Sequence, residues 1–395
     1  MPEFTCKNIN CVDLFSGCGG LSYGFHKEGF NIITCNELEK SISETYKHNY
    51  PNTNIIVGDI TNPKIKEELY DNFTDKECDV VLGGPQCVAY SMAGFRNSRD
   101  PRGQLFKDYV EVVNKLKPKV FIMENVKGIL SMLHDKPKLN KEEKKIADKY
   151  YKLEGKKLEY ESQKKVEKDE EKIKDIINKL NRVKKDIKKM NKDLYKFRMK
   201  VTELIKDSFS ELGYNVNMKL LNAANFGVPQ KRERVIFIGI RTDINKEITY
   251  PEETHNEEGT DNKQKWVSVK ESIKDLEDLK EDVEFNQIYT NHRQEIINRI
   301  KNTNIGESLN KKYKEAYFKC YPDKPSNTVK ENHGGVFLHY KKNRVMTPRE
   351  LARLQSFPDD FIFKGSKANI LVQIGNAVPC KLSEVIAKEV KKIFI

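Results

Sequence analysis

Several common features are missing from this sequence of 395 residues. No run approaches 18 uninterrupted apolar residues, so no membrane-spanning helix is expected. The first residues, MPEFTCKNIN, lack a basic stretch followed by an apolar run, so no signal peptide is expected. The eight cysteines are scattered and none follows the CxxC spacing, which argues against a zinc site or a disulfide framework and fits a reducing cytoplasm. We therefore expect no metal site.

The residues that are present indicate a folded protein with an uneven charge distribution. Hydrophobic residues make up 37% of the chain, with 19 Phe and 17 Tyr, which is enough for a sizeable core. Residues 134–200 contain 24 Lys and Arg against 14 Asp and Glu, so they carry +10 of the formal net charge of +12. The positive charge thus says little about nucleic-acid binding by the rest of the chain.

Short apolar runs alternate with helical patterns along the first part of the chain. Helices are predicted over Glu39–Asn49 and Leu105–Leu116. Such alternation is typical of a doubly wound parallel sheet, so the expected fold class is α/β. The predicted strands are Asn10–Phe15, Asn31–Asn36, Thr53–Val57, Asp79–Leu82, Lys119–Met123 and Val235–Ile240.

A helical segment interrupts this pattern. From Ile173 to Leu204 the apolar residues recur in steps of three and four, which is a heptad pattern. A weaker helical pattern precedes it and halts at Gly155. We predict an inserted helical coiled-coil hairpin over residues 134–212. It is either a solvated spacer or a contact for the DNA backbone or a partner, and an exposed seam could pair two copies.

The chain changes character after residue 240. Arg241–Glu284 contains 7 basic and 14 acidic residues, whereas Phe285–Lys330 contains 9 basic and 4 acidic residues. The last part of the chain then returns to compact apolar patterning. We predict one domain formed by residues 1–250 and 368–395, with a smaller domain of residues 251–367 between them.

Polar residues follow the first three predicted strands. The glycine loop Ser16–Gly20 follows the first strand, Glu37 ends the second, and Asp59 follows the third. Glycines let a ligand approach the backbone, and the loop is not GxGxxG, which disfavours dinucleotide pyrophosphate binding. A carboxylate at Glu37 suits a ribose diol, and Asp59 could receive an adenine amino group. Together they predict an adenosine pocket without phosphates, although each alone could be an ordinary turn or cap.

Three further motifs contain candidate catalytic residues. Cys87 lies in a Gly/Pro loop just past a strand, where a nucleophile would be presented, although a lone cysteine is more often a small buried apolar residue. Glu124 stands at the end of a very apolar strand, where a carboxylate is costly unless it is paired or catalytic. Arg232 and Arg234 alternate, so they point to one side of an extended segment. The alternative for this pair is a surface ion-pair strand.

The order of these motifs resembles that of the DNA cytosine-C5 methyltransferases. DLFSGCGG, NELEK, GDI, the Cys87 loop, ENV and QKRER are followed by RELARLQSFPDDF and QIGNAVP. The resemblance covers nearly the whole chain outside the insertion. It implies an S-adenosylmethionine-dependent, Rossmann-like methyltransferase domain and a target-recognition domain at residues 251–367. The implied activity is methylation of C5 of a flipped-out cytosine in a specific short sequence of double-stranded DNA.

The resemblance also implies roles for individual residues. Cys87 would add to C6 of the base, Glu124 would hold the base edge, and Arg232 and Arg234 would position the base and nearby backbone. S-adenosyl-L-methionine would be converted to S-adenosyl-L-homocysteine. The cofactor-binding residues would be Phe15, Gly17, Gly19, Glu37, Leu38, Asp59, Ile60, Gly84, Leu105, Asn376, Ala377 and Val378. The DNA-binding residues would be Ser91 and Arg102, in the segment that resembles the family's mobile loop over the flipped base. Arg293, Arg299 and Lys312, in the basic end of the small domain, are candidates for phosphate contacts, with solvated surface charge as the alternative for each.

Two residues depart from the family's pattern beside the nucleophile. Gln86 and Val88 stand where the family usually has Pro and Gln. They put the rate and loop geometry in question and motivate one alternative, a catalytically weakened or silent DNA-binding paralogue. A second alternative is a tRNA cytosine-C5 methyltransferase, although the CFT signature of that branch is absent. A Rossmann oxidoreductase is disfavoured by the missing GxGxxG. We further expect a cognate restriction endonuclease as a partner and a location in the bacterial cytosol or nucleoid. We expect a monomer, with a dimer through the insertion as the alternative.

Overall fold

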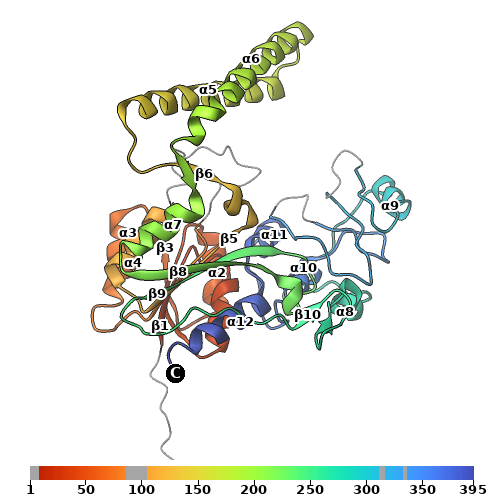
Figure 1. Ribbon diagram of the computed structural model, residues 1–395. Coiled ribbons are helices and arrows are strands. Elements are labelled where there is room, and N and C mark those ends of the chain that lie inside the picture. Colours follow the sequence, from red (N-terminus) through yellow and green to blue (C-terminus); the bar gives the residue numbers. More distant parts are fainter. Residues whose placement is uncertain (1–8, 86–104, 311–315, 332–335) are drawn as a thin grey trace, which may run out of the picture. The chain divides into compact units, whose positions relative to one another are not determined.

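The computed structural model describes residues 9–85, 105–310, 316–331 and 336–395 (Figure 1). The chain forms two compact units. The first comprises Met1–Pro85, Glu111–Glu124 and Tyr214–Ile395, and the second comprises Gln86–Val110 and Asn125–Gly213. The sheet and the C-terminal part of the chain thus share one unit, and the helical insertion lies in the other.

The first unit is built on a seven-stranded sheet with the order β3-β2-β1-β4-β5-β9-β8. β1 to β5 pair in parallel, whereas β8 runs antiparallel to β9. The predicted strands are confirmed to within three residues at their ends. β8 was not predicted because its residues alternate between buried and exposed instead of forming an apolar run. The strands are β1 (Asn10–Leu14), β2 (Asn31–Glu37), β3 (Asn54–Val57), β4 (Val80–Gly83), β5 (Val120–Val126), β8 (Tyr214–Asn222) and β9 (Glu233–Arg241).

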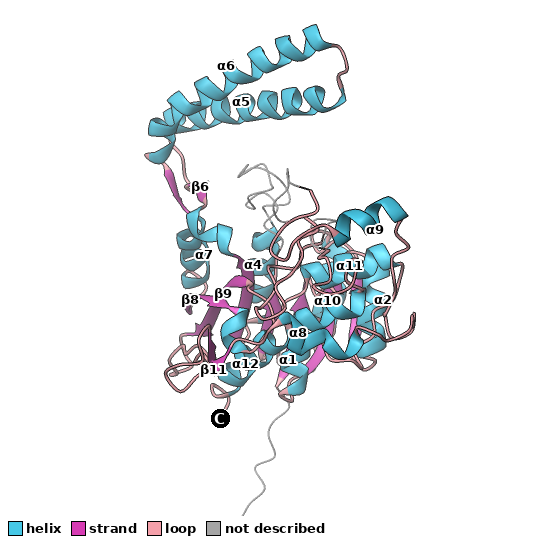
Figure 2. Cartoon of the chain, turned by 90° about the vertical axis from the view of Figure 1, so that its right-hand side faces the viewer, coloured by secondary structure: helices cyan, strands magenta, loops and turns pink. Residues whose placement is uncertain are grey.

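Helices α1 (Gly20–Lys27) and α12 (Cys380–Lys391) pack side by side against the sheet (Figure 2). Leu21 and Phe25 of α1 share one buried cluster with Leu382 and Ile386 of α12 and with residues of β2, β4, β5 and β9. A Cβ atom built on Gly24 would lie 2.2 Å from the backbone of α12, so only glycine permits this approach. The last helix of the chain therefore covers the first.

The rest of the first unit has short elements joined by long loops. The apolar core of residues 269–380 is continuous with Tyr46 and Tyr50 at the end of α2. Its helices are α2 (Lys40–Asn49), α3 (Pro63–Asp71), α8 (Val269–Ile273), α9 (Gln294–Lys301), α10 (Pro348–Leu354) and α11 (Lys367–Asn376), with 3-10 turns at Ala223–Phe226 and Lys274–Leu276 and short strands β10 (His255–Asn256) and β11 (Gln264–Lys265). The buried Arg349 supports the loops by donating hydrogen bonds to the carbonyls of Phe285 and Phe361.

The second unit contains a long helical hairpin. α5 (Lys141–Val166) and α6 (Glu170–Tyr195) lie side by side in both views (Figures 1 and 2). Two details of the prediction were wrong. α5 continues through Gly155, because packing against α6 outweighs a glycine penalty of about 1 kcal/mol. The heptad helix ends at Tyr195 because the chain then forms β7 (Arg198–Lys200), so Val201 and Leu204 lie on α7 (Val201–Ser210). The 3-10 helix Lys127–Ser131 also belongs to the second unit, whereas α4 (Leu105–Leu116) begins in the second unit and ends in the first.

The hairpin is fastened at its base by polar and aromatic contacts. β7 pairs antiparallel with β6 (Leu133–Asp135), and this pairing places Asp135 opposite Arg198. Arg198 Nε and Asp135 Oδ1 are 3.0 Å apart, and the guanidinium lies over the ring of Tyr150. Tyr151 donates its hydroxyl proton to Asp135. The base of the hairpin is therefore tied to its stalk by one ion pair with two tyrosines around it.

The apolar seam of the hairpin is closed within the chain. Ile176, Leu180 and Val183 of α6 are buried, and Leu194 packs with Ala147 of α5. An ion pair between Lys184 Nζ and Glu161 Oε1, 3.2 Å apart, also joins the two helices. Because the seam is already covered by α5, these residues do not need a second copy of the chain to bury them.

One segment, Lys367–Lys391, is long and apolar enough to cross a membrane by length and composition. In the structure this segment is α11 and α12, which are separated by Ala377–Pro379, and most of it is buried inside the first unit. Burial in the core accounts for its apolar character, so it does not indicate a membrane protein.

Candidate active site

The sheet has a switch point between β1 and β4, where the strand order reverses direction. In open α/β sheets, ligands bind outside the carboxyl ends of the strands at such a point. The glycine loop follows β1, Glu37 ends β2, Asp59 follows β3 and Gly84 follows β4. The parallel pairing of these strands therefore brings the predicted cofactor residues of four separate motifs to one edge of the sheet.

The glycine loop is held against Glu37. The backbone N–H of Gly17 donates to Glu37 Oε2 at 2.8 Å, and that of Glu39 donates to Oε1 at 2.9 Å. Each carboxylate oxygen keeps a second lone pair for a hydroxyl group. Burial raises the pKa of Glu37, and these N–H groups lower it, with a net increase. Gly17 has φ +56°, and a Cβ atom added to it would have no other atom within 4 Å, so the loop faces open space.

The neighbouring residues offer both an apolar surface and an acceptor. Leu38 is 60% exposed, which is unusual for a leucine directly after a buried strand. Asp59 is exposed, and one of its oxygens accepts from the backbone N–H of Thr61 at 2.9 Å. Ile60 is buried beside it. An adenosine group needs this combination of an apolar face and polar acceptors at its edge, so the residues present fit such a group.

The C-terminal segment of the chain completes this edge. Asn376 ends α11 and is exposed, and Ala377 and Val378 follow it. A Cβ atom on Gly20, at the start of α1, would lie 2.5 Å from the carbonyl oxygen of Val378. The QIGNAVP motif is thus packed directly on the helix that follows the glycine loop.

Arg232 lies in a buried joint between three segments of the chain. It is 1% exposed, and its Nη1 and Nη2 donate to the carbonyls of Val329 and Gly375 at 2.8 and 2.9 Å. Burial lowers the pKa of this guanidinium well below its usual value. A Cβ atom on Gly375 would lie 2.3 Å from the backbone N of Glu331. Arg232 therefore ties the QKRER segment and residues 324–329 (KPSNTV) to α11, the helix that ends at Asn376.

Two buried glutamines complete the joint and were not predicted. Gln230 Oε1 accepts from the backbone N–H of Val329, and its amide donates to Leu354 O and Gln355 Oε1. Gln355 in turn donates to the carbonyl of Ile374. Their only signal in the sequence is that each lies inside a familial block, in QKRER and RELARLQ. A fully buried glutamine with several partners fixes the relative position of the segments it joins.

Glu124 and Arg234 form an ion pair across β5 and β9. Arg234 Nε lies 2.7 Å from Glu124 Oε1, and both side chains are mostly buried. Burial lowers the pKa of Arg234, and the charge of Glu124 partly opposes this. A Cβ atom on Gly84 would come within 3.0 Å of Glu124 Oε2, so glycine leaves room for the carboxylate beside the end of β4. Arg232 and Arg234 thus have different partners, a pair of carbonyls for the first and a carboxylate for the second.

Other predicted site residues are placed as follows. Phe15 follows β1 with a left-handed backbone, and Gly19 precedes α1 with φ +95°. Leu105 is the first residue of α4, in the second unit. Arg293 and Arg299 are exposed at the start and near the end of α9, and Arg299 donates to the carbonyl of Leu309. The predicted residues outside the described part of the chain are Gln86, Cys87, Val88, Ser91, Arg102 and Lys312.

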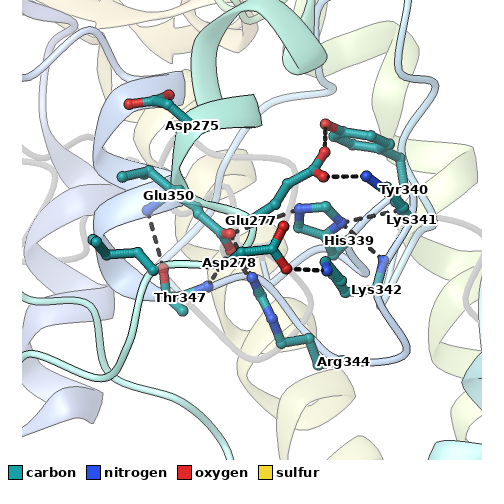
Figure 3. A network of polar contacts seen from close by, with 12 residues as sticks. Asp275, Glu277, Asp278, His339, Tyr340, Lys341, Lys342, Arg344, Thr347 and Glu350 are labelled. Carbon is teal, nitrogen blue, oxygen red and sulfur yellow. Dashed lines mark hydrogen bonds and ion pairs between the residues drawn. The ribbon is translucent and has the colours of Figure 1, made fainter.

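A second polar network anchors the RELARLQ helix, α10 (Figure 3). Glu350 is fully buried and accepts two hydrogen bonds from Arg344, at 2.8 and 2.7 Å, and one from the backbone N–H of Thr347. His339 Nε2 lies 3.7 Å from Glu350, while its Nδ1 accepts from the backbone N–H groups of Lys341 and Lys342. Burial lowers the pKa of His339 to about 4, so it is neutral at pH 7.

Comparison with known proteins identifies the class that this fold and site define. The model of the C-5 cytosine-specific DNA methylase family matches residues 9–155 and 183–392. The chain therefore belongs to the family of C-5 cytosine-specific DNA methylases, enzymes that use S-adenosylmethionine as methyl donor and release S-adenosylhomocysteine. The unmatched residues 156–182 belong to the far half of the helical hairpin.

Relatives match over nearly their full length. The chain is 34% identical over 403 residues to Type II methyltransferase M1.HphI of Haemophilus parahaemolyticus, covering 98% of this chain and 88% of that protein. It is 29% identical over 440 residues to Type II methyltransferase M.DdeI of Desulfomicrobium norvegicum, covering 98% and 89%. A solved structure of a candidate prophage-encoded DNA modification methyltransferase from E. coli is 22% identical, covers 98% and 99% of the two chains and gives a TM-score of 0.67, which supports the fold.

Proposed function

We propose that this enzyme is the modification methyltransferase of a Type II restriction–modification system and methylates C5 of a flipped-out cytosine in one short sequence of double-stranded DNA. The family and the names of its relatives support the reaction class and the biological setting. The observation that carries the site assignment is the Glu124–Arg234 pair, which lies beside the end of β4, from which the chain leads into the Cys87 loop. The partner would be a cognate restriction endonuclease, and the location the bacterial cytosol.

The proposed chemistry starts at Cys87. Its thiolate adds to C6 of the cytosine, and the electron pair of the C5–C6 double bond moves so that C5 becomes nucleophilic. C5 then accepts the methyl group that the cofactor supplies. Removal of the proton from C5 and breakage of the sulfur–C6 bond restore the aromatic ring and the thiolate. Because C5 and C6 lie inside the stacked duplex, the base must first be flipped out.

Glu124 would hold the polar edge of the flipped base. A carboxyl group can bind the N3 and exocyclic amine edge and offset the charge that develops during addition. Arg234 would act as a positioning residue, because its Nε holds one oxygen of Glu124 and leaves the other beside Gly84. Arg232 would also be a positioning residue, because it binds the buried carbonyls of Val329 and Gly375.

The adenosine part of the cofactor would lie at the carboxyl edge of the sheet. Glu37 would accept from the ribose hydroxyls, Asp59 would accept from the adenine amino group, and Leu38 and Ile60 would contact the ring. The methionine part would lie near the glycine loop, with the backbone of Asn376–Val378 on its other side. The further contacts would be Phe15, Gly17, Gly19, Gly84 and Leu105.

Residues 251–367 would form the target-recognition domain, with Arg293, Arg299 and Lys312 contacting phosphates. Ser91 and Arg102 would contact DNA as well. The enzyme would act as a monomer, because α5 already covers the apolar seam of α6. Light scattering tests this point, and a dimer that the deletion of residues 141–195 converts to a monomer would contradict it.

Bisulfite sequencing of plasmid DNA from cells that express the protein tests the proposed function. We expect methylated cytosines in one short motif, and none with Cys87→Ala. Cys320→Ala, which removes a buried thiol of the first unit, serves as the matched control and should keep the pattern. An unmethylated plasmid together with folded, cofactor-binding protein would favour a silent paralogue. Methyl transfer to tRNA in place of duplex DNA would favour the RNA alternative.

A further inference from the structure

One half of helix α6 carries a strongly segregated positive charge. Residues 179–190 contain six basic side chains and one acidic side chain, a net charge of +5. Helix α5, by contrast, mixes nine basic with six acidic residues. Four of the six basic side chains in residues 179–190 are exposed and form no ion pair with any residue in the described ranges. We call them the basic stripe: Arg182, Lys185, Lys188 and Lys189.

The basic stripe lies away from the seam of the hairpin. At 3.6 residues per turn, Arg182, Lys185 and Lys189 fall within about 60° of one another, on the side opposite Leu180 and Val183. Because that seam is buried against α5, the stripe faces solvent. Its length from Arg182 to Lys189 is about 10 Å, at 1.5 Å per residue.

Neither packing nor the helix dipole accounts for the stripe. The dipole favours cations only in about the last turn of a helix, and Arg182 and Lys185 lie well before the end at Tyr195. Like charges three and four residues apart, such as Lys185 and Lys189, repel and weaken the helix. The N-terminal part of α6 shows no such segregation, since residues 170–178 contain two basic and three acidic side chains. A ligand with closely spaced negative charges would remove this repulsion.

We propose that the basic stripe of α6 is an accessory site for the phosphate backbone of duplex DNA, used in addition to the recognition and catalytic residues. This inference rests on the proposed function. A duplex presents a phosphate about every 3.4 Å of helix axis along each strand, so a 10 Å row of cations can face about three of them. The site reads no sequence, because phosphate contacts are the same at every base pair. It would hold DNA that flanks the target site.

The test compares two full-length variants with the same loss of charge. The stripe variant replaces Arg182, Lys185, Lys188 and Lys189 by Gln. The control variant replaces Lys145, Lys152, Lys156 and Lys165 of α5, which are exposed on the same hairpin, by Gln. Binding to a duplex of about 12 base pairs and to one of about 40 base pairs, both with the target site, is measured from 50 to 200 mM salt. Circular dichroism verifies that both variants keep their helices.

Each lost phosphate contact lowers the slope of log K against log salt concentration by about 0.9. On the long duplex we expect the magnitude of this slope to be smaller by about 3 for the stripe variant than for the wild type, and on the short duplex we expect little difference. The kcat of the stripe variant on the short duplex should equal the wild-type value. The control variant should bind both duplexes nearly as the wild type does. An equal loss in the two variants, or no loss in either, would overturn the proposal. Wild-type protein that binds no duplex at all would instead refute the proposed function.

Discussion

Glu124 and Arg234 are 110 residues apart in the chain, yet strands β5 and β9 place their Oε1 and Nε atoms 2.7 Å apart. Glu124 ends an apolar stretch of β5, where an isolated charge would be expensive, and Arg234 supplies the compensating charge. The pair therefore explains how the carboxylate that we propose to be catalytic is tolerated at this position. It also links the geometry of the proposed site to the stability of the sheet.

Separate substitutions distinguish these two contributions. Arg234→Ala leaves a largely buried carboxylate without its partner and should lower the free energy of unfolding by about 3 kcal/mol. Glu124→Gln keeps a hydrogen-bond acceptor for Arg234 but removes its counter-charge, so we expect about 2 kcal/mol of destabilisation, less than for Arg234→Ala. Its kcat should nevertheless fall at least about 100-fold, because the amide cannot support protonation at N3. Urea unfolding and single-turnover methyl transfer measure the two effects. A Glu124→Gln variant with wild-type kcat would contradict the proposed role.

Arg232 should affect cofactor binding more than the chemical step. Arg232→Lys keeps a positive charge but cannot reach the carbonyls of Val329 and Gly375 together in the way that a guanidinium does. The segment that leads to Asn376 would loosen, so we expect the Kd of S-adenosylhomocysteine to rise about 10-fold, which corresponds to about 1.4 kcal/mol. Isothermal titration calorimetry measures this. A fall in kcat with unchanged cofactor affinity would instead assign Arg232 to the reacting base.

Replacement of glycine by alanine should have opposite effects on stability in α1 and α5. Gly24→Ala forces a methyl group into the backbone of α12, so we expect about 3 kcal/mol of destabilisation and weaker cofactor binding. Gly155→Ala in α5 meets no atom within 4 Å and should stabilise the hairpin by about 1 kcal/mol. Urea unfolding tests the first variant, and hydrogen exchange of the α5 amides tests the second. Equal effects at the two positions would contradict the packing described for α1 and α12.

His339 should contribute to instability in mild acid. Its pKa is lowered from 6.5 to about 4 in the folded state, so the unfolded chain binds more protons between these values. The free energy of unfolding therefore falls as the pH drops from 6.5 to 4, by about 3 kcal/mol for this residue. His339→Asn can still accept from the N–H groups of Lys341 and Lys342 but does not titrate. Urea unfolding at pH 7 and pH 4 should show a smaller loss for this variant, and an equal loss would exclude His339 as the cause.

The sequence predicts the parts of the site that depend on local order. The glycine loop, Glu37 and Asp59 each follow a strand, and parallel strands bring such positions to one edge of a sheet, so their proximity could be inferred. The Glu124–Arg234 pair could not, because it depends on β5 and β9 being neighbours. The buried contacts of Gln230 and Gln355 depend on long-range packing in the same way. β8 was missed because its alternation of apolar and polar residues was not recognised, and α5 was expected to end at Gly155 because the gain from packing on α6 is invisible in either helix alone.

The contact between α1 and α12 has a consequence for the order of events during synthesis. Leu21 and Phe25 are made long before Leu382 and Ile386, the residues of α12 in the same buried cluster. Until then the first βα unit has an uncovered apolar face, and the edge that awaits Asn376–Val378 is incomplete. A nascent chain therefore cannot complete the proposed cofactor site until α12 has emerged. Methylation competence would appear in one late step, and prematurely terminated chains would be inactive and prone to aggregate.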